Sequence, residues 1–478
     1  MKDAHRVLAF ASANRPRFIE ELRAFIRFPS VSAQPNHVGD LKRCATWLAG
    51  HLSEIGLQRV HVIPTKGHPL VYGEWLRGPG RPTVLIYGHY DVQPADPLGA
   101  WRTPPFEPTV RGDNIYGRGA ADDKGQLFAH VKAIECFLRT AGRPPVNVRC
   151  LFEGEEESGS TNFDSFLRRY RRALAADVAL MSDMPILGPD RPAITYSMRG
   201  ALSLELEVRG QRNDLHSGNF GGAVRNPLQA LCEILGSLHG DDGRIRVPGF
   251  YDRVRECNPR ERAYMRHCGP SDSEVLQNGG AEFGWGERGF SLYERITIRP
   301  SLTLNGIVGG YQGEGGKAVI PARATGKLNF RLVRDQDPHE IEALFREHIA
   351  RVTPRGVRSQ VRGISYAKPA RVPRDHPALQ AAAVAYRLGF GAEPVFLRVG
   401  GSLPVVNSFQ EILGIPTVLM GFALPDDRLH GPNEKFHLPN FFNGIATSIS
   451  FLREMGRISF QRTGESTGAC KRPEAVAR

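Results

Sequence analysis

The sequence predicts an α/β protein in which a mostly parallel central sheet, flanked by helices, is interrupted by a smaller α+β domain. Up to about residue 190, short apolar runs bounded by Gly and Pro alternate with segments of helical apolar spacing, which is the pattern of a layered α/β domain. From about residue 198 the runs alternate apolar and polar residues, as half-exposed strands do. Because the first pattern returns after Tyr366, we expect one discontinuous α/β domain that carries an insertion.

The expected elements follow from these periods in chain order. The first helix, over 15–28, rests on Phe18, Leu22, Phe25 and Ile26, which recur at helical spacing before Pro29. The other elements of the α/β domain are the helices 41–55, 124–140, 377–388 and 440–455 and the strands 60–63, 70–72, 84–87, 146–152, 178–181 and 417–420. The insertion has the strands 201–208, 301–304 and 327–333 and the helices 227–238 and 338–352.

The order of elements in the insertion suits a ferredoxin-like unit of strand, helix, two strands, helix and strand. We therefore expect four segments: the first part of the α/β domain over 1–197, the inserted domain over 198–365, the second part of the α/β domain over 366–460, and a polar, disordered tail over 461–478.

Composition argues against several classes of protein. No apolar run approaches the ~18 residues of a membrane helix, and the first residues lack the apolar stretch of a signal peptide. The seven cysteines are scattered and form no CxxC pair, which argues against a disulfide framework and favours the cytoplasm. The net charge of +12 reflects 52 Arg and 10 Lys spread over the chain without a nucleic-acid-binding motif, so we expect neither nucleic acid nor a membrane as partner.

Acidic and histidine side chains gather just after predicted strands or in glycine-rich loops. They are His89 and Asp91 in GHYDVQP, Asp122 and Asp123 in GRGAADDKG, Glu153, Glu155, Glu156 and Glu157 in FEGEEESG, Asp183 in MSD, and His430 in RLHGPNE. Each cluster alone has an ordinary interpretation, such as a helix cap for the paired aspartates or a solvated patch for the glutamates. Together they follow the carboxyl ends of strands, where ligands bind in open α/β sheets.

This set of side chains points to metal chemistry. Several carboxylates in one cleft repel one another unless a cation neutralises them. Two histidines with several carboxylates suit Zn²⁺, Mn²⁺ or Co²⁺, and three carboxylates with two histidines suffice for two ions if one carboxylate bridges them. Two ions ~3.5–4 Å apart can hold a water, lower its pKa and polarise a carbonyl, while a further glutamate moves the proton. The residues therefore predict the hydrolysis of an amide.

In this order the motifs resemble the di-zinc exopeptidase family of carnosine and cytosolic non-specific dipeptidases, glutamate carboxypeptidases, aminoacylases and acetylornithine deacetylases. The resemblance runs from about Arg15 to about Met455 and is greatest to the dipeptidase branch, through GHYDVQP, YGRGAADDKG, FEGEEESGS, ITYSMRG, DLHSG, VIPARATGKLNFRLV and GGSLPV. It implies two divalent ions per subunit, with Zn²⁺ expected and Mn²⁺ or Co²⁺ as alternatives. It also implies a catalytic α/β domain and an inserted lid domain that joins two subunits into a homodimer.

The resemblance assigns roles around the metal ions. The ligands would be His89 and Asp183 on one ion, Glu157 and His430 on the other, and Asp122 between both. Glu156 would be the general base and Asp91 would orient His89, whereas Asp123 would cap the following helix.

The resemblance also assigns roles to residues that would meet the substrate. His216 in DLHSG would stabilise the oxyanion and belongs to the inserted domain. Arg331 would clamp the carboxylate of the substrate, with Asn305 also directed to the substrate. The loop of Gly400, Gly401 and Ser402 would offer backbone N–H groups to the same carboxylate, although a plain tight turn is the alternative interpretation.

The expected function is a metal-dependent dipeptidase or related exopeptidase, which hydrolyses the peptide bond of dipeptides through a water held between two metals with Glu156 as general base. The alternative is an N-acyl-amino-acid deacylase of the aminoacylase or acetylornithine deacetylase kind, which would use the same ions. A non-catalytic homologue is a weaker alternative because every expected ligand position carries a suitable residue.

Overall fold

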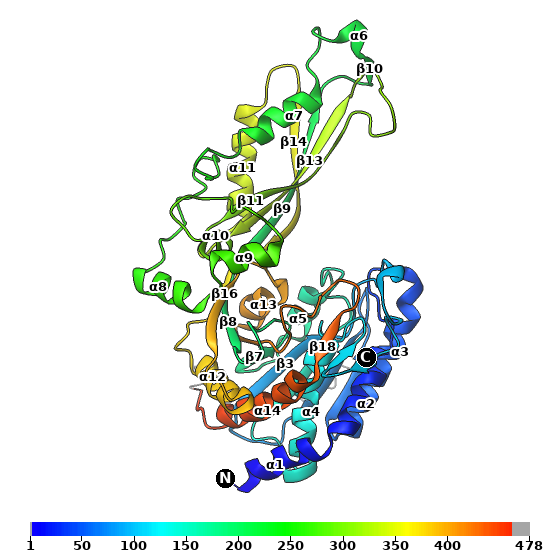
Figure 1. Ribbon diagram of the computed structural model, residues 1–478, viewed down its shortest axis with the longest axis vertical. Coiled ribbons are helices and arrows are strands. Elements are labelled where there is room, and N and C mark those ends of the chain that lie inside the picture. Colours follow the sequence, from blue (N-terminus) through cyan, green and yellow to red (C-terminus); the bar gives the residue numbers. More distant parts are fainter. Residues whose placement is uncertain (1, 461–478) are drawn as a thin grey trace. The chain divides into compact units, whose positions relative to one another are not determined.

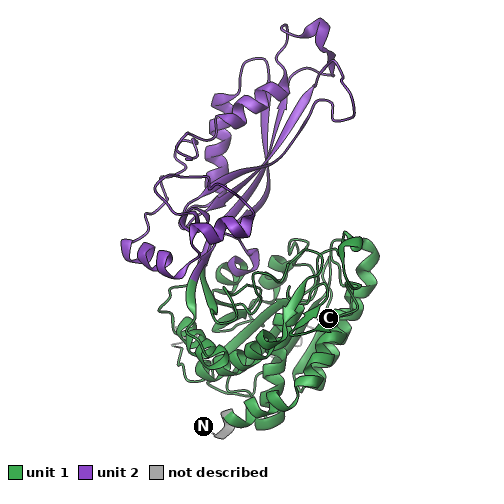
Figure 2. Cartoon of the chain, in the orientation of Figure 1, with its two compact units in different colours: residues 1–196, 372–396, 408–478 green, residues 197–371, 397–407 purple. Residues whose placement is uncertain are grey.

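The computed structural model describes residues 2–460 (Figure 1), so the tail expected to be disordered over 461–478 lies outside the described residues. The chain forms two compact units (Figure 2). The first comprises the residues up to Tyr196, Val372–Phe396 and the residues from Ser408 on, and the second comprises Ser197–Arg371 and Leu397–Asn407. Residues 397–407, which follow the insertion in the sequence, therefore belong to the second unit.

A nine-stranded sheet supplies the main strands of the first unit, and residues 197–198, 370–371 and 397–399 of this sheet fall within the second. Its strands, in spatial order, are β1 (Gln58–Ile63), β2 (Leu70–Trp75), β6 (Asn147–Glu153), β3 (Thr83–His89), β7 (Val178–Met181), β17 (Thr417–Met420), β8 (Ala193–Met198) and β15 (Ala370–Arg371), with β16 (Val395–Val399) also paired to β8. The four central strands β6, β3, β7 and β17 run parallel, and β1, β2, β8 and β15 run antiparallel to their neighbours. This arrangement confirms the predicted fold class.

The register of the parallel strands brings their carboxyl ends to one edge of the sheet. His89 at the end of β3 lies opposite Glu153 at the end of β6. Tyr87 of β3 pairs with Met181 of β7, and Leu419 of β17 pairs with the same Met181. Residues that follow these four strands therefore start from neighbouring points at the edge where open α/β sheets bind ligands.

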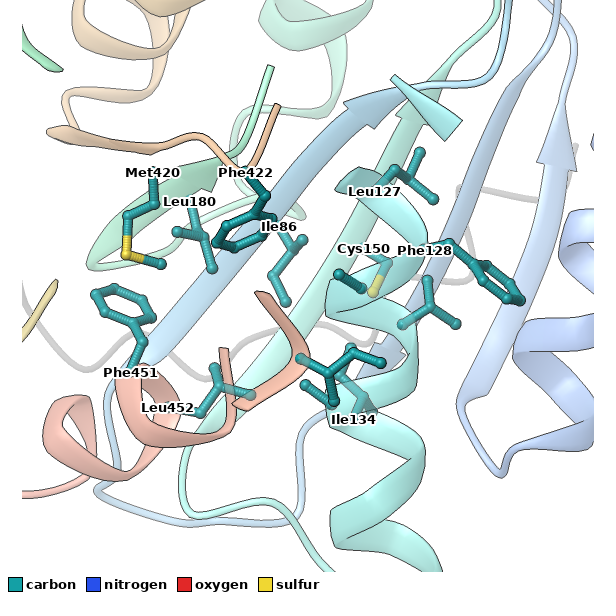
Figure 3. Packing of buried hydrophobic residues seen from close by; sticks show 14 of the residues in the cluster. Ile86, Leu127, Phe128, Ile134, Cys150, Leu180, Met420, Phe422, Phe451 and Leu452 are labelled. Atoms are coloured by element: carbon teal, nitrogen blue, oxygen red, sulfur yellow. The ribbon is translucent and has the colours of Figure 1, made fainter. Parts of the chain in front are cut away.

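Helices cover the sheet and bury one large apolar cluster. They are α2 (Arg15–Ile26), α3 (Val38–Glu54), α4 (Lys124–Ala141), α12 (Pro377–Phe390) and α14 (Leu438–Met455), with α1 (Lys2–Ala13) packed against α4. The helices α4 and α14 lie side by side (Figure 1). Ile86, Leu180 and Met420 from the strands meet Ile134 of α4 and Leu452 of α14 in the core (Figure 3). Each such side chain contributes about 1.5–3 kcal/mol when fully buried, so the core fixes the strands that lead to the clustered acidic residues.

The second unit has an antiparallel sheet with the expected order of elements. These are β9 (Gly200–Arg209), α7 (Pro227–Gly236), β11 (Ser301–Gly309), β13 (Arg323–Leu332), α11 (Pro338–Val352) and β14 (Arg358–Ala367), and the strand order is β11-β13-β9-β14. Alternate residues of β9, such as Leu204 and Leu206, are buried with Ile234 of α7 and Phe345 of α11. The strict alternation in β9 is what predicted a half-exposed strand.

Short elements complete both units. The first unit has a small sheet of β4 (Thr109–Arg111), β5 (Asn114–Tyr116) and β18 (Lys435–His437), together with α5 (Phe163–Tyr170), the one-turn helices Pro35–His37 and Leu98–Ala100, and a π-helical turn over Phe409–Leu413. The second has β10 (Leu215–His216), β12 (Val319–Ile320), α6 (Ser217–Phe220), α8 (Pro259–Cys268), α9 (Asp272–Gly279), α10 (Leu292–Thr297) and α13 (Pro404–Ser408). Every helix within 2–460 is too short or too polar to cross a bilayer.

Candidate metal centre

His89 stands at the end of β3 with its ring fully buried. Its Nδ1 lies 3.1 Å from the backbone oxygen of Asp91 and 3.5 Å from the Asp91 carboxylate. Its Nε2 lies 3.1 Å from Asp122 Oδ1 and 3.8 Å from Asp183 Oδ2. A contact on one ring nitrogen fixes the orientation of the imidazole, so Asp91 directs Nε2 of His89 toward the carboxylates of Asp122 and Asp183.

Asp122 joins this group to a second one. It lies in the loop before α4, and its Oδ2 is 2.9 Å from Nε2 of His430. The same His430 nitrogen is 3.4 Å from Glu157 Oε1. In each group, three ligand atoms lie within 4.8 Å of one another: one group is His89, Asp122 and Asp183, and the other is Asp122, Glu157 and His430. The five residues expected as ligands from the sequence are thus brought together, with Asp122 common to both groups.

The donor atoms suit divalent metal ions. Nε2 of His89 is buried and has no hydrogen-bond partner within the described part of the chain, because its contact with Asp122 has the distance of a hydrogen bond but not the direction. A buried polar nitrogen without a partner is costly unless something else binds it. Imidazole nitrogen and carboxylate oxygen are the donors that Zn²⁺ and similar ions accept, so each group could hold one ion.

The side chains of the two groups perturb one another strongly. Burial by itself would lower the pKa of the His89 imidazole, but the carboxylates of Asp122 and Asp91 raise it well above its ordinary value. The contacts of His430 with Asp122 and Glu157 raise the pKa of His430 to about 10. Burial would raise the pKa of Asp122, yet the two imidazoles hold it below its ordinary value. Positive charge therefore stabilises the ionised carboxylates at this point.

The three consecutive glutamates after β6 have different environments. The Asp91 carboxylate accepts the backbone N–H groups of Glu156 at 3.2 Å and of Glu157 at 3.0 Å. Glu155 turns the other way, and its carboxylate accepts the backbone N–H groups of His68 and Asn162. Geometry therefore separates Glu155 from the pair beside His89, a distinction that the run of identical residues does not reveal.

Glu156 is a half-buried carboxyl next to the first group of donors. Burial raises the pKa of Glu156 to about 8, with His89 opposing this shift and Asp183 adding to it. A carboxyl that gains and loses a proton near neutral pH is suited to proton transfer.

Asp123 occupies the N-cap position of α4, but its side chain makes no capping hydrogen bond. Its Oδ2 instead accepts the backbone N–H of His89 at 3.2 Å. The expectation that the Asp123 side chain caps the helix is therefore wrong, because this carboxylate binds the strand end at His89 instead.

A buried ion pair that the sequence did not suggest holds the loops of the site. Glu434 and Arg118 are buried, and Arg118 donates to the Glu434 carboxylate at 2.7 Å. The same carboxylate accepts the backbone N–H groups of Gly119, Ala121 and Asp122. These contacts fix the loop that carries Asp122.

The guanidinium of Arg118 also reaches the other loops of the site, donating to the backbone oxygens of His430 at 2.9 Å and Pro94 at 3.2 Å. Arg118 lies in the GRGAADD motif, and Glu434 follows His430 by four residues. The only sequence signal for the pair is thus its proximity to motif residues, since the two charges are 316 positions apart.

The expected substrate-binding residues lie in the second unit. Arg331 of β13 donates to Ser402 Oγ at 3.0 Å, and Ser402 Oγ donates to the backbone oxygen of Arg199. Nε of Arg199 donates to the backbone oxygen of Gly400 at 3.2 Å. Two guanidinium groups and the loop 400–402 therefore lie close together.

Asn305 and His216 occupy other places in the second unit. Asn305 is exposed on β11, where its Oδ1 accepts from Thr303 Oγ1 at 3.2 Å. His216 ends β10 and is exposed, and its Nδ1 accepts the backbone N–H of Gly218 at 3.0 Å. Within the residues that the structure describes, no hydrogen bond is seen between either of them and Arg331.

Comparisons with known proteins agree with this geometry. The model of the family described as peptidase family M20/M25/M40 matches residues 85–454. The Cys-Gly metallodipeptidase dug1 of Schizosaccharomyces pombe is 31% identical over 465 residues, which cover 93% of this chain and 97% of that protein.

Two solved structures share both fold and sequence. The structure of human carnosine dipeptidase 1 has a TM-score of 0.80 and 30% identity, covering 95% of this chain and 99% of that chain. The M20 family metallo-carboxypeptidase Sso-CP2 of Sulfolobus solfataricus has a TM-score of 0.83 and 31% identity, covering 92% and 99%. The family match includes all five residues that form the two donor groups, and this chain belongs to peptidase family M20/M25/M40.

Proposed function

We propose that this protein is a metal-dependent dipeptidase that hydrolyses the peptide bond of dipeptides. The observation that carries the proposal is the pair of donor groups that share Asp122 at the carboxyl edge of the parallel sheet. The relatives named above as a metallodipeptidase and a carnosine dipeptidase align over nearly the whole chain. The deacylase alternative shares the donor set but has no such support.

The proposed ligands are His89 and Asp183 for one ion, Glu157 and His430 for the other, and Asp122 for both. The distances among their donor atoms support this assignment. Zn²⁺ is the proposed metal, with Mn²⁺ and Co²⁺ as alternatives that accept the same donors. When bound, such ions lower the pKa of a water and polarise the peptide carbonyl.

Glu156 is the proposed general base. Its carboxylate would take a proton from the attacking water and deliver it to the leaving nitrogen, and its place beside His89 and Asp183 suits both transfers. Asp91 would position both His89 and Glu156, since it contacts the ring of His89 and accepts the backbone N–H of Glu156.

The second unit is the proposed lid and dimerisation domain, in line with the insertion expected over 198–365. Arg331, Ser402 and the glycines 400 and 401 would bind the free carboxylate of the dipeptide, with Asn305 contributing a further polar contact. His216 would stabilise the oxyanion from the partner subunit. The edge strand β11 supports a homodimer, because it exposes Ile307 and Val308 beside unpaired backbone groups.

We also propose that the protein works in the cytoplasm. The six described cysteines are free thiols, namely Cys44, Cys136, Cys150, Cys232, Cys257 and Cys268. Free thiols persist in a reducing compartment.

The test uses purified protein with measured metal content and two substrate panels, free dipeptides and N-acyl amino acids, each with and without chelator. We expect hydrolysis of dipeptides only, lost on chelation and restored by Zn²⁺ or Mn²⁺. Glu156→Gln should abolish turnover, by a factor of about 100 or more, while keeping the metal content. Near-normal activity of this variant would rule out Glu156 as base, and exclusive cleavage of N-acyl amino acids would favour the deacylase.

A further inference from the structure

A basic pocket of about 260 Å³ lies in the first unit, apart from the donor groups of the metal centre. Its lining includes the cationic side chains of Arg102, Arg111, Arg428 and Lys435 and the carboxylate of Asp426. The volume equals that of about eight or nine water molecules, which leaves room for a small polyatomic ion with a short organic group.

The four cations in the pocket differ in whether they form ion pairs. Lys435 is already paired, with Asp427 at 2.9 Å and Asp426 at 3.1 Å. In contrast, no carboxylate within residues 2–460 forms an ion pair with Arg102, Arg111 or Arg428. Cations gathered in one concave site create a positive potential that favours anions.

Regular structure and a bridging side chain fix the walls of the pocket. Arg111 lies on β4, and its guanidinium is 5.8 Å from the ring centre of Tyr116 on β5. Asn433 connects its own loop to the segment that carries Arg102. Its Oδ1 accepts the backbone N–H of Arg102 at 2.7 Å, and its Nδ2 donates to the backbone oxygen of Ala100 at 2.8 Å. The positive side chains therefore extend from a hydrogen-bonded framework, which reduces the cost of ordering them around a ligand.

We propose that this pocket binds a small oxyanion of the phosphate class, as the free ion or as a phosphate monoester. Each guanidinium offers a planar fork of N–H donors that matches two phosphate oxygens. Lys435 is paired with Asp426 and Asp427, so those three charges sum to −1. With the three guanidinium groups the sum is +2, which a dianion neutralises. The site is independent of the proposed peptidase function, because none of its residues belongs to the two donor groups.

Binding at this pocket would also act on the loop that carries His430. Arg428 precedes His430 by two residues, and Lys435 follows Glu434 directly. An anion held by Arg102 and Arg111 on one side and Arg428 on the other would join this loop to β4. We expect the backbone amides of residues 426–435 to exchange hydrogen more slowly with the anion bound.

The test is calorimetric titration of inorganic phosphate into the metal-loaded protein at constant ionic strength, set with chloride. Arg102→Gln/Arg111→Gln removes two charges from the pocket without touching the His430 loop. Arg171→Gln/Arg172→Gln is the matched control, because it removes two exposed charges after α5. We expect the affinity for phosphate to fall by a factor of about ten or more in the first variant. In the second variant the affinity should be unchanged.

Two further arms keep the experiment decisive. Phosphate that binds only at the metal ions would bind the pocket variant as tightly as the wild type, which would overturn the proposal. If the double variant fails to fold, Arg428→Gln must show the same loss of affinity. Titration of glycerol 3-phosphate identifies the source: tighter binding than free phosphate indicates a monoester and weaker binding the free ion, and the pocket variant loses affinity in both cases.

Discussion

Replacing Glu434 with Gln tests how the loops of the metal centre are held. The carboxylate of Glu434 is fully buried and accepts four hydrogen bonds, from the Arg118 side chain and from the backbone N–H groups of Gly119, Ala121 and Asp122. A glutamine offers one oxygen in place of two, so its NH₂ group must face some of these donors. The substitution also leaves the buried Arg118 without its counter-charge.

The magnitude follows from these contacts. Breaking a buried ion pair from one side costs about 3–5 kcal/mol. Arg118 keeps its hydrogen bonds to the backbone oxygens of His430 and Pro94, which offsets part of the loss. Burial raises the pKa of Glu434 to about 7, with Arg118 opposing the shift, so the carboxylate is ionised at pH 8. We therefore expect Glu434→Gln to lower the free energy of unfolding by about 3 kcal/mol at that pH.

The assay combines urea unfolding of the metal-loaded protein with competition for its metal by a chelator. Metal affinity should fall by about tenfold or more, because both the Asp122 loop and the His430 loop loosen. Glu393→Gln is the control, since its ion pair with Arg387 is exposed and is worth about 1 kcal/mol at most. A loss below about 1 kcal/mol with unchanged metal affinity would refute the assigned role of the pair.

Three further predictions concern other parts of the chain. Lys132→Met removes the buried cation that contacts Glu135 and His51, so urea unfolding should show a loss of about 3 kcal/mol, and a loss under 1 kcal/mol would contradict this account. Burial lowers the pKa of His130 to about 3, so the unfolded chain binds a proton at His130 before the folded chain does as the pH falls through 6.5. Lowering the pH from 6.5 to 5.5 should therefore reduce the free energy of unfolding by about 1 kcal/mol less in His130→Gln than in the wild type. An equal reduction in both proteins would show that His130 titrates normally. Arg331→Met should raise KM for dipeptides about tenfold or more with little change in kcat, whereas dipeptide amides, which lack the carboxylate, should react as with the wild type.

Local sequence pattern was sufficient for elements with a clear apolar face. The bounds predicted for β7, α11 and β17 agree with the structure, because periodic apolar residues mark both ends. The helices α8, α9 and α10 were missed, since α8 and α9 expose most of their surface and α10 has only six residues. A signal for two of them was present: Ser271 with Glu274, and Ser291 with Glu294, form capping boxes.

The candidate site divides in the same way. The donors follow strands whose carboxyl ends share one edge, so sequence order and the rules for parallel sheets suffice to group them. The Asp91 carboxylate accepts the backbone N–H groups of Glu156 and Glu157, whereas the Glu155 carboxylate accepts those of His68 and Asn162. No local pattern encodes this difference. The Arg118–Glu434 pair is likewise invisible before folding, because it forms between distant segments that tertiary packing brings together.

The chain leaves and re-enters the large sheet at adjacent points. Met198 at the end of β8 pairs with Ala370 of β15, and Ser197 pairs with Arg371, so the stretch between these strands begins and ends on neighbouring backbone. A domain inserted at such a junction lengthens the chain without separating the two paired strands. Swapping the stretch for that of another family member thus requires matching only two neighbouring splice points, together with the short return of residues 397–407.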